Sequence, residues 1–328
     1  MAIEVFNRYE NKYMLDAETF DRILFGISGY MSPDAHNAGG KLYTVANIYY
    51  DTPDHGFIRR SLQKPTYKEK VRLRGYLSEH AAAPVIASAQ TPALGSGHGT
   101  SVNGHGKSAP GAGGPVPAAM YPAPTSRRLS LAEDALVYVE VKKKVNGLVN
   151  KRRTAMKLPE AYAFLNGGMT GVAPYMNSQV MEEISYIIRR DRPEPAAWIA
   201  YDRMAFFAND NDDLRISFDT NIRTRRHALS LLEGDSGAPL LKDGRWLMEI
   251  KTARAMPLWL CRLLSENKVY PTSFSKYGAE FKQYVAALDA PRGYANGIGH
   301  YEAAQQIPPA KSPVLLGPAM ADEAARCA

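Results

Sequence analysis

Residues 68–74 read Lys-Glu-Lys-Val-Arg-Leu-Arg, with a cation at every second position. Successive side chains of a β-strand point to opposite faces, so in a strand the four cations share one face. Val71 and Leu73 then lie on the other face. The stretch therefore predicts a strand with one cationic face and one apolar face.

The same alternation of charged and apolar residues returns in four later segments, which predicts a sheet built from similar strands. The dipeptides Asn146-Gly147 and Asp243-Gly244 are typical of tight hairpins, which indicates mainly antiparallel pairing. Helical spacing occurs over 16–27, 257–264 and 280–288. We therefore predict an α+β fold, with helices covering the apolar faces. The four segments are Val137–Lys142, Tyr201 with Arg203, Leu214–Asp219 and Trp246–Lys251.

The charged faces of these strands can lie in one of two environments. In an open sheet they face water, which is the ordinary outcome for a single amphipathic strand. In a closed barrel they line a lumen, where like charges repel unless counter-charge is present. A bound polyanion is one source of that counter-charge.

The composition agrees with an anionic partner. The chain has 328 residues, with 40 Lys plus Arg against 33 Asp plus Glu, a net charge of +7. It has two cysteines, no run of about 18 apolar residues and no signal-peptide pattern, so we expect a cytoplasmic protein without a membrane span. Ala, Pro, Gly and Ser dominate residues 79–126, and Pro, Ala and Gly are abundant again in 291–328. We predict a single domain over 1–290, interrupted by a disordered insert at about 79–126 and followed by a flexible tail.

Eight short motifs together resemble the catalytic VTC (vacuolar transporter chaperone) domain, the polyphosphate polymerase branch of the triphosphate tunnel metalloenzyme, or CYTH, superfamily. Their order along the chain is also the family's. They are Glu10–Tyr13, Ile48–Thr52, Val71–Arg74, Val139–Lys142, Tyr201–Arg203, Arg215–Asp219, Met248–Lys251 and Phe274–Tyr277. The chain departs from the eukaryotic complexes in having no phosphate-sensor domain and no membrane helices, so coupled export of a product is not expected.

The resemblance implies an eight-stranded antiparallel β-barrel with helices packed outside and an active-site tunnel inside. By motif position it assigns catalytic roles to Arg72, Arg74, Lys142, Arg203, Arg215 and Lys276. It assigns substrate binding to Lys12, Lys70, Lys151, Tyr201, Lys251 and Ser275. Its metal-binding glutamate falls on Glu249, with Glu140 and Glu10 as weaker candidates, and hard oxygen ligands favour Mn²⁺ or Mg²⁺.

The implied reaction transfers the γ-phosphate of ATP to orthophosphate or to a growing polyphosphate chain. Two alternatives stay open, hydrolysis of a triphosphate by water and non-catalytic binding of polyphosphate or an inositol phosphate. Glu249 argues against the pure binder, which has no need of a metal carboxylate. Nucleic acid is not expected, because it calls for exposed aromatics and surface cations. No protein partner is predicted.

Overall fold

The computed structural model describes residues 9–79, 129–146, 148–168, 171–210, 213–241 and 244–289. The predicted tail at 291–328 lies outside these residues. So does the predicted insert at 79–126, apart from Glu79, which ends a strand.

Eleven strands and six α-helices form the described part of the chain. The strands are β1 (Tyr9–Leu15), β2 (Met31–Pro33), β3 (Tyr43–Asp51), β4 (Tyr67–Glu79), β5 (Leu129–Ser130), β6 (Leu136–Val145), β7 (Leu148–Lys157), β8 (Glu194–Ala208), β9 (Arg215–Arg225), β10 (Ala238–Pro239) and β11 (Trp246–Thr252). The helices are α1 (Ala17–Ile27), α2 (Gly56–Leu62), α3 (Leu158–Leu165), α4 (Ser178–Asp191), α5 (Leu258–Glu266) and α6 (Lys276–Asp289), with a 3₁₀-helix at Ala35–Gly40.

All strand pairs are antiparallel, and eight strands follow one path in the order β1-β11-β9-β8-β3-β4-β6-β7. Three short strands lie off this path: β2 pairs with β8, β5 pairs with β4, and β10 pairs with β9. Asn146 has a φ of 47° at the turn between β6 and β7, where Val145 pairs with Leu148, so the predicted hairpin is confirmed. The predicted α+β class and antiparallel sheet are confirmed as well.

The sheet is strongly curled. β1 and β6 are the first and seventh strands of the path, so in a flat sheet they would lie about 29 Å apart. Yet the Glu10 carboxylate of β1 reaches to within 3.6 Å of the Lys142 ammonium of β6. The sheet therefore has a concave inner face and a convex outer face.

The closed barrel expected from the resemblance is wrong for the described residues, because the sheet stays open. No pairing joins β1 to β7, the two ends of the strand path. At Lys12 the free edge of β1 accepts a 2.7 Å hydrogen bond from the backbone N–H of Thr272 instead. The segment before α6 thus takes the backbone acceptor that a neighbouring strand would use, and the strands of the described ranges do not enclose a tunnel.

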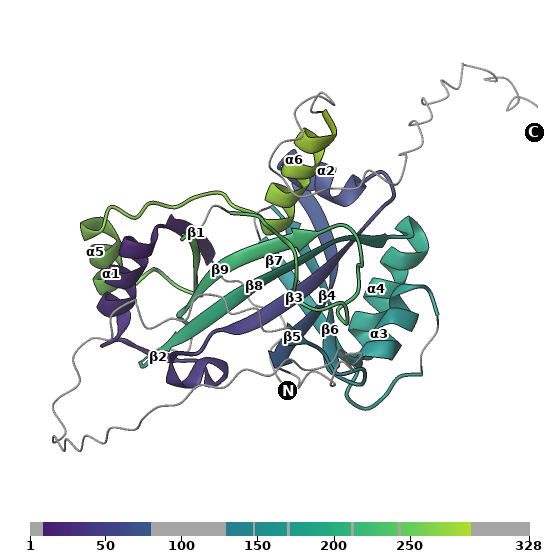
Figure 1. Cartoon of the computed structure of the whole chain (residues 1–328), viewed down its shortest axis with the longest axis horizontal. Helices are drawn as coiled ribbons and strands as arrows, with labels where there is room; N and C mark the ends of the chain where they lie inside the picture. Colours follow the sequence, from purple (N-terminus) through teal and green to yellow (C-terminus); the bar gives the residue numbers. More distant parts are fainter. Residues whose placement is uncertain are drawn as a thin grey trace, which may run out of the picture. The chain divides into compact units, whose positions relative to one another are not determined.

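Helices cover the convex face in two groups, at opposite ends of the sheet in Figure 1. Helices α3 and α4 pack on β3, β4 and β6 around fully buried Leu73, Val139 and Ile184. Helices α1 and α5 pack on β1, β9 and β11, where Phe20 stacks on Trp246. The helix cap predicted at Asp16 is confirmed. The Asp16 side chain accepts a hydrogen bond from the Thr19 N–H at the N-terminus of α1. None of the helices in the described ranges is long and apolar enough to cross a bilayer.

Helices α2 and α6 lie together in the upper part of Figure 1 and cover part of the concave face. Tyr277 and Phe281 of α6 pack there against Ile199 and Tyr201 of β8. Asp51 joins the three elements, because its carboxylate accepts the Phe57 N–H and Ile58 N–H of α2 and the Tyr277 hydroxyl of α6. The first residue of α6, Lys276, consequently lies at the edge of the uncovered part.

Candidate functional site

The concave face gathers charges from all parts of the chain, and the strand registers explain why. Arg72 of β4 lies opposite Glu140 of β6, and Lys12 of β1 lies opposite Glu249 of β11. Nine cations and four carboxylates meet in this way, which gives an excess of five positive charges when every group is ionised. We call them the cationic face: Lys12, Lys70, Arg72, Arg74, Lys142, Lys151, Arg203, Lys251 and Lys276, with Glu10, Glu140, Asp219 and Glu249.

Glu140 anchors the cations of β4 and β7. It is 1% exposed and lies 2.5 Å from Arg72, 3.6 Å from Arg74 and 2.8 Å from Lys151. Burial opposes ionisation, but Arg72 and Arg74 outweigh it and hold the pKa of Glu140 well below its usual range. The carboxylate therefore stays charged and fixes the direction of the two arginines.

Glu249 anchors the cations at the other end of the face. Its carboxylate lies 3.2 Å from Lys12, 3.3 Å from Lys251 and 3.9 Å from Lys276. Burial opposes its ionisation, yet these lysines hold the pKa of Glu249 well below its usual range. Glu10 lies 3.5 Å from Lys12, and its pKa is lowered because the surrounding lysines outweigh burial and the neighbouring Glu249.

Asp219 is a member of this face that the sequence patterns did not single out. It is fully buried, accepts hydrogen bonds of 2.6 and 2.8 Å from Arg203, and lies 2.5 Å from the Lys276 ammonium. Tyr201 lies between the same cations, with the Lys276 ammonium 4.2 Å from its ring centre. Burial raises its pKa, but Arg203, Arg74 and Lys276 lower the pKa of Tyr201 to about 8 overall.

Two neutral partners were also missed. Asn47 is fully buried and accepts a 3.0 Å hydrogen bond from Arg74, while the Tyr49 hydroxyl accepts one of 3.4 Å from Arg72. Both residues lie directly opposite these arginines on β3. Alternation of polar and apolar residues in β3 could have identified Asn47 and Tyr49. Almost every residue of this strand is buried, however, and apolar residues lie on both of its faces, so the alternation is not visible in the sequence.

Lysines lie opposite lysines along β4, β6 and β7. Lys70 faces Lys142, Lys142 faces Lys151, and Lys68 faces Lys144 one step further along. Lys70 has the Ser275 hydroxyl, 3.2 Å away, as its hydrogen-bond partner, and no carboxylate of the described residues pairs with it. Burial, Lys142 and Lys68 together lower the pKa of Lys70 to about 7. Like charges directly opposite are destabilising, so this arrangement favours an anionic ligand.

Two of the predicted residues have additional structural roles. Ser275 precedes α6 and its hydroxyl accepts the Gly278 N–H, so it caps the helix as well as contacting Lys70. Arg215 lies on the concave side, but its guanidinium is directed at Asp34, 3.1 Å away, and over the Phe207 ring. Arg215 is thus at the border of the cationic face. The other eleven residues predicted for catalysis or substrate binding belong to the cationic face or contact it.

Two carboxylates of the cationic face are of a kind that could contribute ligands to a divalent metal ion. Glu249 and Glu10 offer hard oxygen ligands on neighbouring strands, as Mg²⁺ and Mn²⁺ prefer. The described residues hold no group of three or more His, Cys, Asp or Glu placed to bind a metal ion. Phosphate oxygens and water would therefore have to supply the remaining ligands. Glu140 is less suited, because it is 1% exposed and its contacts with Arg72 and Lys151, at 2.5 and 2.8 Å, are closer than those of Glu249 with its lysines.

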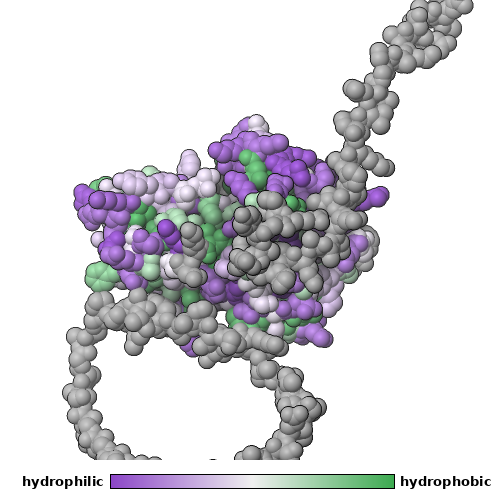
Figure 2. All heavy atoms as spheres, turned by 45° about the horizontal axis from the view of Figure 1, so that its top comes forward, coloured by the Kyte–Doolittle hydropathy of each residue, from purple (hydrophilic) through white to green (hydrophobic). Residues whose placement is uncertain are grey.

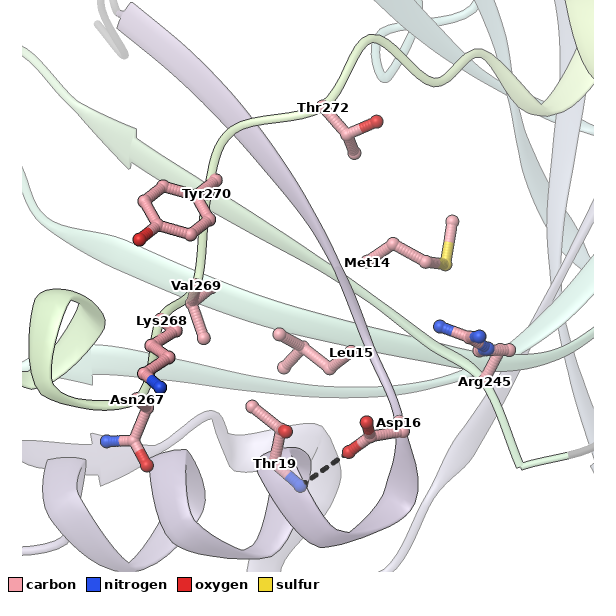
Figure 3. A pocket seen from close by; sticks show the side chains of 10 residues that line it. All are labelled: Met14, Leu15, Asp16, Thr19, Arg245, Asn267, Lys268, Val269, Tyr270 and Thr272. Atoms are coloured by element: carbon pink, nitrogen blue, oxygen red, sulfur yellow. Dashed lines mark hydrogen bonds between the residues drawn. The ribbon is translucent and has the colours of Figure 1, made fainter.

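A separate pocket of about 310 Å³ lies between the end of β1, the start of α1 and residues 267–272 (Figure 3). Asp16 in this pocket is committed to the Thr19 N–H, and Lys268 and Arg245 lie on opposite sides of it. It therefore lacks the converging charges of the concave face. On the face drawn in Figure 2, hydrophobic residues form limited patches among hydrophilic ones.

Solved structures with similar chain traces are distant. The PH1819 protein of Pyrococcus horikoshii OT3 matches with 10% identity and a TM-score of 0.35, covering 84% of this chain and 99% of the other. A protein described as a putative adenylate cyclase from Vibrio parahaemolyticus matches with 10% identity and a TM-score of 0.36, with the same coverage. None of the curated proteins matches the sequence.

The family comparison matches most of the chain. The VTC domain model matches residues 7–88 and 125–285, which include every residue of the cationic face. The two matched segments are separated by the composition-biased stretch around residue 100. The chain therefore belongs to the VTC domain family.

Proposed function

We propose that this protein is a metal-dependent ATP–polyphosphate phosphotransferase of the triphosphate tunnel type. It would transfer the γ-phosphate of ATP to orthophosphate or to a growing polyphosphate chain and release ADP. The excess of five positive charges on the concave face carries the proposal. Membership of the VTC domain family supports it, and a cytoplasmic location is part of it.

Phosphoryl transfer depends mainly on positioning and on neutralising charge, and the cationic face has side chains for both. Arg72 and Arg74 offer planar guanidinium groups that can donate two parallel hydrogen bonds to phosphate oxygens. Lys142, Lys251 and Lys276 add less directional charge. A divalent ion held by Glu249 and by phosphate would supply further neutralisation, and the lysines beside Glu249 would orient the same oxygens.

A polymeric product is favoured over a free triphosphate by the lysine row, which we define as Lys70, Lys68 and Lys144. A strand advances about 7 Å for every two residues, so Lys68 lies about 13 Å along β4 from Arg72. Within the described residues no carboxylate pairs with these three lysines. The row therefore extends the positive charge beyond the arginines, where a longer polyanion could follow it.

A single incubation tests the reaction class. Purified protein is given ATP, Mn²⁺ and orthophosphate, and products are separated on a urea gel and by nucleotide chromatography. Chains of polyphosphate with equimolar ADP per phosphate transferred support the polymerase. Free phosphate without chains would establish the triphosphatase, and tight binding without turnover would establish a binding module. The Arg152→Ala variant is the control, because Arg152 pairs with Glu183 of α4, away from the concave face.

A further inference from the structure

Three tyrosines form a cluster at the end of the cationic face opposite the lysine row. Tyr43 of β3, Tyr76 of β4 and Tyr138 of β6 have ring centres 6.1 Å and 6.2 Å apart in turn. We call them the tyrosine rim. Tyr138 lies directly opposite Arg74, and Tyr76 follows Arg74 by two residues on the same strand. Tyr138 is thus level with Arg74, and Tyr76 lies about 7 Å beyond Arg74 along β4.

The three tyrosines differ in how they relate to the hydrophobic core. Tyr43 packs against the buried cluster beneath α6. Tyr76 is 36% exposed, and neither it nor Tyr138 belongs to the apolar clusters of the described residues. The guanidinium of Arg153 lies 4.5 Å from the centre of the Tyr138 ring, so a cation is stacked beside the phenols. Burial raises the pKa of Tyr43 to about 12, so its phenol stays neutral at ordinary pH.

Flat rings next to a stacked guanidinium are the groups on which nucleobases stack. A nucleoside triphosphate carries its negative charge at one end and a flat base at the other. The concave face has the same two parts in the same order, with arginines beside aromatics. An inorganic triphosphate would use the first part alone.

We propose that the tyrosine rim is a nucleobase subsite, which stacks the base of a nucleoside triphosphate whose phosphates lie over Arg72 and Arg74. This inference rests on the proposed function. It also gives the substrate a direction, because the base at the rim leaves the γ-phosphate pointing toward Lys70 and the lysine row. Stacking does not read base edges, so ATP and GTP are expected to bind with similar affinity.

Calorimetry with two ligands tests the subsite. ATP and inorganic tripolyphosphate are titrated into wild type and into the Tyr76→Ala, Tyr138→Ala double variant. Loss of base stacking is expected to weaken ATP binding between about five-fold and 150-fold, with tripolyphosphate affinity unchanged. The Tyr76→Phe, Tyr138→Phe variant keeps the rings and should bind ATP as wild type does. Tyr270→Ala, at a 73% exposed tyrosine, is the control and should change neither affinity.

The outcomes separate this inference from the proposed function. Unchanged ATP affinity in the alanine variant would overturn the subsite while leaving the cationic face intact. Equal losses for ATP and tripolyphosphate would also overturn it, since the rings would then support the cationic face and not the base. A wild-type protein that binds neither ligand would overturn the subsite and the proposed function together.

Discussion

The ammonium of Lys276, the first residue of α6, lies 2.5 Å from the Asp219 carboxylate of β9, which also accepts two hydrogen bonds from Arg203. All three side chains are buried. This contact ties the helix that covers the concave face to the strand beneath it. It also means that the Asp219 carboxylate contacts two buried cations at once, with Glu249 3.9 Å from Lys276 as the next nearest carboxylate.

Replacing Asp219 with Asn should leave Arg203 without its ion-pair partner and Lys276 with the more distant Glu249 carboxylate, 3.9 Å away. Removing one partner of a buried ion pair costs about 3–5 kcal/mol, so the free energy of unfolding should fall by about that amount in urea denaturation. Added tripolyphosphate should recover part of the loss, because it supplies negative charge. Glu18→Gln, in the exposed pair with Arg22, is the control and should cost less than about 1 kcal/mol. An Asn variant as stable as that control would contradict the role given to Asp219.

The Arg72→Ala, Arg74→Ala double variant should lose affinity for tripolyphosphate. Each hydrogen bond to a charged group is worth about 1.5–3 kcal/mol, so the combined loss should be at least about 3 kcal/mol, more than 100-fold in Kd. Calorimetry measures this, with circular dichroism to verify folding. The Arg72→Lys, Arg74→Lys double variant keeps the two charges but loses the planar guanidinium groups. Its affinity for tripolyphosphate should lie between those of wild type and the alanine variant. Wild-type affinity in the alanine variant would remove both arginines from the site.

Lys70 should make triphosphate binding depend on pH. With a pKa of about 7 in the free protein, Lys70 loses its proton as pH rises through 7. Bound phosphate favours the charged form and raises this pKa, so binding at pH 8 should take up a proton and weaken as pH rises further. Titrations in two buffers of different ionisation enthalpy measure the uptake. The arginine of the Lys70→Arg variant stays charged, so this variant should take up fewer protons on binding. Equal proton uptake by wild type and the variant would contradict the pKa assigned to Lys70.

The Lys68→Ala, Lys144→Ala variant should distinguish long anions from short ones. Because these lysines lie beyond the arginines, affinity for long-chain polyphosphate should fall about ten-fold or more, at roughly 1 kcal/mol per exposed charge pair, while tripolyphosphate affinity stays the same. Fluorescence competition between the two ligands reads out the difference. The matched control is Lys143→Ala, since Lys143 points to Glu183 on the convex side. Equal affinity for both lengths would show that the chain does not follow this row.

Mn²⁺ should bind tightly only together with a triphosphate. Glu249 and Glu10 supply few ligands and are paired with lysines, so electron paramagnetic resonance should show weak binding of Mn²⁺ alone. Tripolyphosphate should strengthen that binding, and Glu249→Gln should abolish the gain while tripolyphosphate affinity without metal stays similar or rises. Undiminished Mn²⁺ binding by the Gln variant would rule out Glu249 as a ligand.

Local patterns in the sequence predicted the elements whose two faces differ. The alternation in 68–74 predicted β4 because charged and apolar positions strictly alternate there, and Asp16 before a helical pattern predicted α1. Helix α6 was predicted from residue 280, yet it begins at Lys276 because Ser275 caps it. Helices α2, α3 and α4 were missed. The buried residues of α4 do recur at helical spacing, so that signal was available in the sequence.

Alternation along each strand was enough to place the cations of β4, β6, β9 and β11 on a single face, since neighbouring side chains must point in opposite directions. The partners of those cations and the closure of the sheet depend on register and curvature, which join residues far apart in the chain. Asp219 meets Lys276 across 57 positions, and Thr272 occupies the edge of β1 that a closed barrel would need. Such contacts are decided by packing in three dimensions, so only the folded structure could reveal them.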